Sequence, residues 1–401
     1  MVGGALCLVA AAVWAGPQGA QFRISTCTTC RQEVPAVAGA PSGDFLAVWE
    51  GQSSKDFRGI SGRFYKGTTP AVTDLQVNKN LSPDQYDAAV TRDAKGNYIV
   101  VWSEVANGNS EIMGQRFLPA GTPTGNPFKV NVDAPGSPSI PSDLKPAIAP
   151  TSDGGFVVVW LNILPAGNNF PGSDPQVMAR RFSKTGAAVG SQIKLNAGLV
   201  DGVRPDVCVD TSGKIIVVWT TADQFLPFQP YKRGLSMRRL SSTLAPLAGE
   251  EKILPPTATY MQPAISCGTA GTFVVVWHSE LPPASVGTDI VGQRFSKLGA
   301  KVGAAFRINT ATANDQRSPS ISTDSKGNFV VVWEGRSGSK YGIFGRRFTP
   351  AGAAAGPEFE VFTDPIFRQI SSRVAHTSAS GNFVVVWQDA NKKAYGRRFT
   401  P

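Results

Sequence analysis

The chain has 401 residues, a formal net charge of +10 and only 17% charged residues. Its 42 Gly and 30 Pro show no period of three, which excludes a collagen-like fibre, and a hydrophobic share of 42% excludes wholesale disorder. The length exceeds that of most single domains unless the chain is built from repeats.

The first feature of the chain is an apolar stretch over residues 5–15. It is too short to span a bilayer as a helix, and Gly16 and Pro17 would end one. We interpret residues 1–18 as a secretory signal peptide, although no Lys or Arg precedes the stretch. The alternative is an apolar N-terminal strand or a buried tail. The interpretation predicts a secreted or cell-surface protein, and no other segment is long and apolar enough for a membrane span.

Cys27 and Cys30 have the spacing of a redox or zinc motif. A redox pair normally starts a helix, and no helical pattern follows here; a zinc site would need a second ligand pair at a suitable spacing. We therefore expect a short disulfide-pinned loop or two unpaired thiols. The pairing of Cys208 and Cys267 stays open, and we expect no metal and no cofactor.

One phrase, typified by GNFVVVW, recurs seven times and is the main signal in the sequence. Its tryptophans are Trp49, Trp102, Trp160, Trp219, Trp277, Trp333 and Trp387. A Gly six residues before each Trp marks a turn, and an unbroken apolar run such as residues 329–333 predicts a strand buried on both faces. Each sheet must therefore pack between two others.

A first strand precedes each turn, with an apolar residue twelve positions before the Trp and usually a Pro two positions earlier. These apolar residues are Val37, Val90, Ile148, Val207, Ile265, Ile321 and Ala375. A variable loop, an Arg-Phe pair (Arg-Leu in one copy), a Gly-rich turn and a fourth strand follow the Trp. Each repeat thus predicts one antiparallel sheet of four strands.

The two ends of the chain indicate a closed ring. The seventh copy ends at Pro401 without a fourth strand, whereas residues 21–25 match the fourth strand at residues 305–309 and have no repeat of their own. We predict an all-β, seven-bladed β-propeller over residues 19–401, with the last blade closed by the N-terminal strand.

The phrase GNFVVVW followed by an I-x-G-Q/R-R-F strand resembles tandem repeats of exported or surface-attached bacterial proteins, a group of largely uncharacterised function. Residues 96–117, 271–295 and 327–348 carry the resemblance best, and it covers essentially the whole mature chain. It implies a propeller and export but no defined reaction. The chain lacks the D-x-D-x-D-G runs of calcium-associated versions, so we carry over no calcium site.

The seven Arg of the Arg-Phe pairs occur in every copy. A ring of guanidinium groups that binds an anion is one interpretation. We favour a structural role instead, with each Arg stacked on the Trp of its own blade or paired with a carbonyl or carboxylate.

The copies differ most in the loop after the Trp, and repeats three to five carry extensions. In a propeller these loops share one face with the connections between blades. We predict a recognition patch for a glycan or a cell-surface protein there, made of Phe170, Phe225, Leu226, Phe228, Tyr231 and Lys232. Alternatively, and more commonly for longer loops, these loops fold back and bury their own apolar groups.

Signals for catalysis are few, and we assign no catalytic residue. His278 and His376 lie outside any known catalytic motif, and lone histidines are usually structural. Four carboxylates in the extended loops support the alternative function, a carbohydrate-active hydrolase or lyase: Asp174, Asp223, Glu280 and Asp289.

The basic residues are dispersed over all repeats and form no dense tract, which argues against a nucleic-acid partner. Attraction to anionic cell-surface polymers, or simply a soluble basic surface, explains the charge better. We therefore expect an exported, monomeric binding or scaffolding module.

Overall fold

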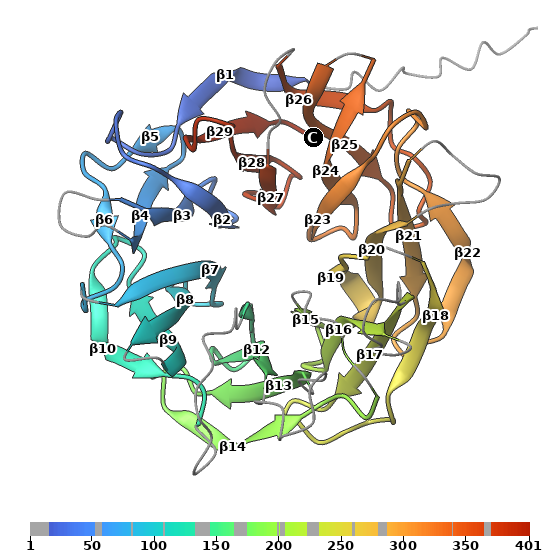
Figure 1. Ribbon diagram of the computed structural model, residues 1–401, viewed down its shortest axis with the longest axis horizontal. Coiled ribbons are helices and arrows are strands. Elements are labelled where there is room, and N and C mark those ends of the chain that lie inside the picture. Colours follow the sequence, from blue (N-terminus) through green and yellow to red (C-terminus); the bar gives the residue numbers. More distant parts are fainter. Residues whose placement is uncertain are drawn as a thin grey trace, which may run out of the picture.

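Figure 1 shows the computed structural model of the chain, a closed ring of sheets around one axis. The structure describes residues 16–52, 58–81, 83–106, 109–132, 145–163, 175–198, 200, 205–222, 232–258, 261–279, 287–338, 340–364 and 370–401. These residues form seven antiparallel sheets and one short 3-10 helix, η1 (Thr269–Gly271). The predicted all-β, seven-bladed propeller is confirmed.

Each blade places the first strand of its repeat innermost. These strands are β2 (Glu33–Gly39), β7 (Asp84–Arg92), β11 (Ala147–Pro150), β15 (Asp206–Val209), β19 (Ala264–Cys267), β23 (Arg317–Thr323) and β27 (Ile370–His376). The second strands, which contain the repeated Trp, are β3 (Phe45–Gly51), β8 (Tyr98–Ala106), β12 (Phe156–Ile163), β16 (Ile215–Ala222), β20 (Phe273–Ser279), β24 (Phe329–Ser337) and β28 (Phe383–Gln388).

The third strands end at the Arg-Phe or Arg-Leu pair. They are β4 (Gly59–Lys66), β9 (Asn109–Phe117), β13 (Pro175–Phe182), β17 (Arg233–Leu240), β21 (Asp289–Phe295), β25 (Lys340–Phe348) and β29 (Ala394–Phe399). The outermost strands are β5 (Thr69–Pro70) and β6 (Leu75–Gln76) in blade 1, then β10 (Pro123–Lys129), β14 (Ala188–Lys194), β18 (Glu251–Ala258), β22 (Lys301–Arg307), β26 (Phe359–Asp364) and β1 (Pro17–Arg23).

The ring closes as the sequence predicts, because β1 is the outermost strand of blade 7. It pairs antiparallel with β29, with Pro17 opposite Phe399 and Phe22 opposite Gly396, and Figure 1 shows the two strands side by side. This ladder already includes Pro17 and Gln18, which the predicted leader of residues 1–18 also contains. A cleavage that keeps the ladder whole must therefore precede Pro17.

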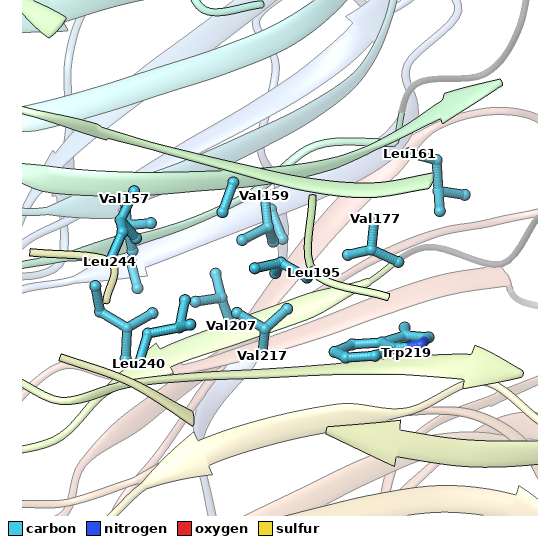
Figure 2. Packing of buried hydrophobic residues seen from close by; sticks show 14 of the residues in the cluster. Val157, Val159, Leu161, Val177, Leu195, Val207, Val217, Trp219, Leu240 and Leu244 are labelled. Atoms are coloured by element: carbon cyan, nitrogen blue, oxygen red, sulfur yellow. The ribbon is translucent and has the colours of Figure 1, made fainter. Parts of the chain in front are cut away.

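The Trp strands carry the core, as their unbroken apolar runs predict. Every repeated Trp has at most 2% of its surface exposed. Trp219 of blade 4 packs against Val177 and Leu161 of blade 3 (Figure 2), whereas Ile216 and Val218 of the same strand face blade 5. Alternate side chains thus fill the interfaces with both neighbouring blades, and this packing holds the ring together.

The Gly six residues before each Trp adopts a positive φ, for example 85° at Gly327, where a Cβ would be strained. The turn in blade 7 is one residue longer than that in blade 6, since Thr377 N–H donates to Asn382 O whereas Asp324 N–H donates to Asn328 O. Val374, not Ala375, is therefore the innermost apolar residue of blade 7. Counting back twelve positions from the Trp was wrong in this repeat because the turn absorbs an extra residue.

A backbone latch connects successive blades. The side chain that follows the Trp accepts a hydrogen bond from a backbone N–H in the first strand of the next blade, at a residue with positive φ. The pairs are Asp87 N–H to Glu50 Oε2 (2.8 Å), Ser371 N–H to Glu334 Oε1 (2.8 Å) and Val34 N–H to Gln388 Oε1 (2.9 Å). Each latch fixes the start of an innermost strand against the preceding blade.

Candidate functional site

The propeller has two unlike faces. One, here called the loop face, consists of the connections that follow the Trp strands and the connections from each outermost strand to the next blade. The other, the turn face, consists of the Gly turns and the tight turns after the third strands. The described ends of the Trp strands and of the outermost strands lie on the loop face.

Most of the predicted recognition patch lies outside the described residues: Phe170, Phe225, Leu226, Phe228 and Tyr231. Lys232, immediately before β17, is described and exposed. The patch over blades 3 and 4 therefore stays a prediction.

Three of the four predicted loop carboxylates also lie outside the described residues: Asp174, Asp223 and Glu280. Asp289 is fully buried at the start of β21. Its Oδ2 lies 3.2 Å from Arg307 Nε, and its Oδ1 accepts a hydrogen bond from Asn309 Nδ2 at 2.7 Å. Asp289 is thus a buried structural anchor.

Both histidines lie inside the sheets, in keeping with the expected structural role. His278 follows the Trp of blade 5 and is 7% exposed, and His376 Nδ1 lies 2.9 Å from Ser322 Oγ of blade 6. Burial lowers the pKa of each imidazole to about 4. Both rings are therefore neutral at pH 7.

Among the described residues the repeated arginines pair with carbonyls or carboxylates, which is one of the predicted alternatives, and the rings that they contact are those of Phe and Tyr. Arg398 lies over the ring of Phe22 in its own blade and over Phe45 and Tyr65 of blade 1, at 4.5 to 5.6 Å. Elsewhere a carboxylate is the partner, as in the ion pair of Arg181 with Asp153. Adjacent side chains of a strand point to opposite faces of the sheet. Because Phe399 packs against blade 6, the neighbouring Arg398 points toward blade 1.

All four cysteines of the described residues form disulfides. Cys27 pairs with Cys30 in the connection from β1 to β2, which confirms one of the two alternatives for this motif. Cys208 of β15 pairs with Cys267 of β19 and joins blades 4 and 5. No helix among the described residues is long and apolar enough to cross a membrane. Disulfides are typical of oxidising compartments, so these features are compatible with a secreted protein.

The central channel is a narrow cavity of about 220 Å³ walled by the seven innermost strands. Its lining is mainly Ala, Val, Ile and Pro, and the charged residues among those that line it are Asp206 and Arg373. The Asp206 carboxylate accepts hydrogen bonds from the backbone N–H groups of Val207 and Ile265, both at 2.9 Å. The channel therefore presents small apolar side chains and no pair of carboxylates.

A larger hollow of about 550 Å³, the blade 1 hollow, opens where the chain passes from β1 to blade 1. It lies between the disulfide loop at residues 25–30, the end of β3 and the segment around β6. Its lining is Ser25, Thr26, Cys27, Thr29, Cys30, Trp49, Gln52, Ser61, Thr73, Asp74, Leu75 and Gln76. Hydroxyl and amide groups thus predominate.

Asp74 shapes this hollow by holding the disulfide loop. Its carboxylate accepts hydrogen bonds from Ser25 Oγ at 2.7 Å and from the N–H and Oγ1 of Thr26, both at 2.9 Å. On the other side of the loop, Lys393 Nζ donates to the carbonyls of Thr29 and Cys30. The wall of the hollow is therefore preformed.

A smaller cavity of about 170 Å³, the side hollow, adjoins the blade 1 hollow at Gln52, which lines both. It lies between blades 1 and 2 and is lined by Arg31, Glu33, Glu50, Gly51, Gln52, Arg58, Gln85 and Tyr86. Arg58 Nη1 donates to the Tyr86 hydroxyl at 2.9 Å and lies 3.2 Å from Asp84 Oδ2, and both groups raise the pKa of Arg58. This cavity is thus polar and carries paired charges.

The sequence interpretation missed both hollows because it placed recognition on blades 3 and 4. One signal was available. Sites lie where repeats differ, and the connection into blade 1 is the one among the seven with two cysteines. Once residues 21–25 are assigned to blade 7, this unique segment falls on the loop face.

No protein-family model and no curated protein sequence matches this chain. Its structure is similar to that of a protein of unknown function from Dyadobacter fermentans, with a TM-score of 0.57, 11% identity and coverage of 96% of this chain and 99% of that one. It is also similar to the structure of a PL25 ulvan lyase, with a TM-score of 0.59 and 8% identity over 95% of this chain and 96% of the lyase. A third similar structure is the α-L-arabinofuranosidase of Fusarium graminearum, with a TM-score of 0.52 and 12% identity over 96% of this chain and 98% of that enzyme. At these identities the likeness shows the fold alone.

Proposed function

We propose that this chain is an exported, monomeric binding module that recognises a glycan or a protein partner through its loop face. The observation that carries the proposal is the blade 1 hollow. Its volume of about 550 Å³ falls within the roughly 300–1,000 Å³ of small-molecule sites. Its wall is held in place by a disulfide and by hydrogen bonds, which reduces the entropy lost on binding.

The charge distribution supports binding in preference to catalysis. A glycoside hydrolase needs two carboxylates facing one bond, about 5 to 10 Å apart. Asp206, the carboxylate of the central channel, binds backbone N–H groups, and Asp289 is buried against Arg307. Asp74 is likewise occupied by Ser25 and Thr26. Each of these carboxylates already has structural partners.

The two candidate positions on the loop face can be separated by mutation. A glycan array probed with the protein, with Gln52→Ala and with the Phe225→Ala, Phe228→Ala pair locates the ligand. Binding at blade 1 predicts about a fivefold loss of affinity in Gln52→Ala, equivalent to about 1 kcal/mol. Gln21→Ala, an exposed Gln on the outer strand β1, is the control and should change nothing.

Binding at the patch over blades 3 and 4 instead predicts a loss in the Phe pair. The proposal is wrong if the array and a pull-down with cell-surface proteins both show no ligand. New reducing ends or unsaturated products after incubation with a bound glycan would establish the alternative, a hydrolase or lyase.

A further inference from the structure

The blade 1 hollow is nearly neutral although the protein carries a net charge of +10. Among the residues that line it, Asp74 is the one with a charge. Asp74 Oδ1 lies 3.8 Å from Arg63 Nε, whose side chain is only 12% exposed. A partly buried guanidinium therefore balances the carboxylate, and the hollow offers neither a cation nor a free anion to a ligand.

The polar groups of the hollow suit a ligand with many hydroxyls. The exposed Thr26 donates its hydroxyl hydrogen to Asp74, so its lone pairs are left to accept hydrogen bonds from a ligand. The buried Ser25 hydroxyl instead donates to Asp74 and accepts from Cys27 N–H, and so holds the wall in place. The exposed side chains of Gln52 and Thr73, which also line the hollow, supply further donors and acceptors. Hydroxyl groups of a ligand, which both donate and accept, match this mixture.

The same hollow also has an apolar part. Leu75 and the Cys27–Cys30 disulfide, which are partly exposed, line it together with the hydroxyls, whereas Trp49 behind them is only 1% exposed. A pyranose ring has C–H faces that pack on aromatic and sulfur-containing surfaces, and equatorial hydroxyls that point to the polar wall. A uronic or sialic acid would instead bring a carboxylate into a hollow that offers no cation to pair with it, and removing an unpaired charge from water is unfavourable.

We propose that the blade 1 hollow is a binding site for a neutral saccharide, which rests on the binding function proposed above. Thr26, Gln52 and Thr73 bind its hydroxyls, and Leu75 and the Cys27–Cys30 disulfide contact its ring. A longer chain extends past Gln52 into the side hollow, where Tyr86 provides a further aromatic ring. The overall positive charge of the protein has no part in this recognition.

Calorimetric titration of the full-length protein tests the proposal with cellohexaose, mannohexaose and xylohexaose as neutral probes and hexagalacturonate as the acidic probe. We expect at least one neutral hexasaccharide to bind, with an affinity that does not change between about 50 and about 500 mM NaCl, a roughly tenfold range of salt that includes the physiological ionic strength of about 150 mM. Hexagalacturonate should bind at least about tenfold more weakly.

A pair of variants in blade 1 places the ligand. Thr73→Trp fills the hollow from an exposed position and should weaken neutral-sugar binding by at least about tenfold. Thr68→Trp introduces the same side chain at an exposed Thr on the turn face and should have no effect. Circular dichroism and urea unfolding of both variants show whether the fold is kept.

The outcomes separate this inference from the function on which it rests. Preference for hexagalacturonate that declines with salt, or neutral-sugar binding that survives Thr73→Trp, overturns the assignment of the hollow but leaves a glycan-binding protein. Binding of a protein partner alone also overturns it. If neither these saccharides nor the array and pull-down described above yield a ligand, the proposed function fails with it.

Discussion

Arg397 and Arg398 are two adjacent residues that connect three blades. Arg397 Nη1 donates to Val361 O of blade 6 at 2.7 Å, whereas Arg398 Nη2 donates to Gly67 O of blade 1 at 3.1 Å. The same arrangement recurs in blade 6, where Arg346 binds Ile308 O of the preceding blade. In blades 6 and 7 these arginines therefore serve packing between blades.

Replacing Arg398 tests this role directly. Arg398→Met keeps an apolar side chain of similar length but removes the cation over Phe22, Phe45 and Tyr65 and the hydrogen bond to Gly67. We expect the free energy of unfolding to fall by about 2 kcal/mol, measured by urea denaturation. Lys95→Met, at an exposed position of a turn, is the control. Equal stability of the two variants would refute an inter-blade role for Arg398.

The two histidines predict a dependence of stability on pH. Their pKa is about 4 in the folded protein and ordinarily 6.5, so the unfolded chain binds more protons between these values. Stability is therefore complete above pH 6.5 and falls as the pH decreases toward 4, by about 2 kcal/mol for each histidine at pH 4.5. Urea denaturation at pH 7.5 and pH 4.5 measures the loss.

His376→Gln isolates one histidine, because Gln does not titrate and can still bind Ser322. Between pH 7.5 and pH 4.5, the free energy of unfolding of this variant should fall by about 2 kcal/mol less than that of the unmodified protein. An identical loss in both would show that other groups cause the acid sensitivity.

At the scale of elements, the outermost strands are the exposed edges of the propeller, and each is irregular. In β1 the pairing with β29 is interrupted between Gln18 and Phe22, where Gly19 has a φ of 82°. β10, β14 and β22 contain a Gly of similar φ. Such bulges hinder hydrogen bonding with a strand of another chain, so the exposed edges of the seven blades are protected against aggregation.

β1 is the element on which closure depends, and removing it tests the ring. A chain that begins at Ile24 exposes the edge of β29 and loses the contacts of Phe22 with Phe45 and Tyr65. We expect a loss of about 3 kcal/mol in stability, or self-association through β29 in analytical ultracentrifugation. A chain that begins at Gly16 is the matched control.

Adding a synthetic peptide of residues 16–23 to the truncated chain should restore part of its stability. A truncated chain that remains monomeric and as stable as the control would contradict closure by β1.

At the scale of the whole molecule, the two disulfides have different roles. Cys208 and Cys267 are 59 residues apart and lie in the innermost strands of successive blades, so their bond restricts a long loop of the unfolded chain. Cys27 and Cys30 are 3 residues apart and mainly shape the wall of the blade 1 hollow. One bond therefore stabilises the ring and the other a local surface.

The double variants separate these roles. Cys208→Ala with Cys267→Ala should lower the free energy of unfolding by about 2 to 4 kcal/mol, and Cys27→Ala with Cys30→Ala by about 2 kcal/mol or less. Urea denaturation without reductant measures both. A larger loss in the second double variant would show that the short loop, and not the bond between blades, governs the stability of the ring.

The number of blades, the order of strands and the closure by the N-terminal strand can all be predicted from the amino-acid sequence. These follow from local patterns, the Gly turn before each apolar Trp strand, and from counting the strands at the two ends. Three features depend on the tertiary structure: Arg398 binds blade 1, Val374 and not Ala375 holds the innermost apolar position of blade 7, and Cys208 pairs with Cys267. The tertiary structure also placed the blade 1 hollow beside Asp74. Each of these depends on contacts between residues far apart in the chain, which no repeat period encodes.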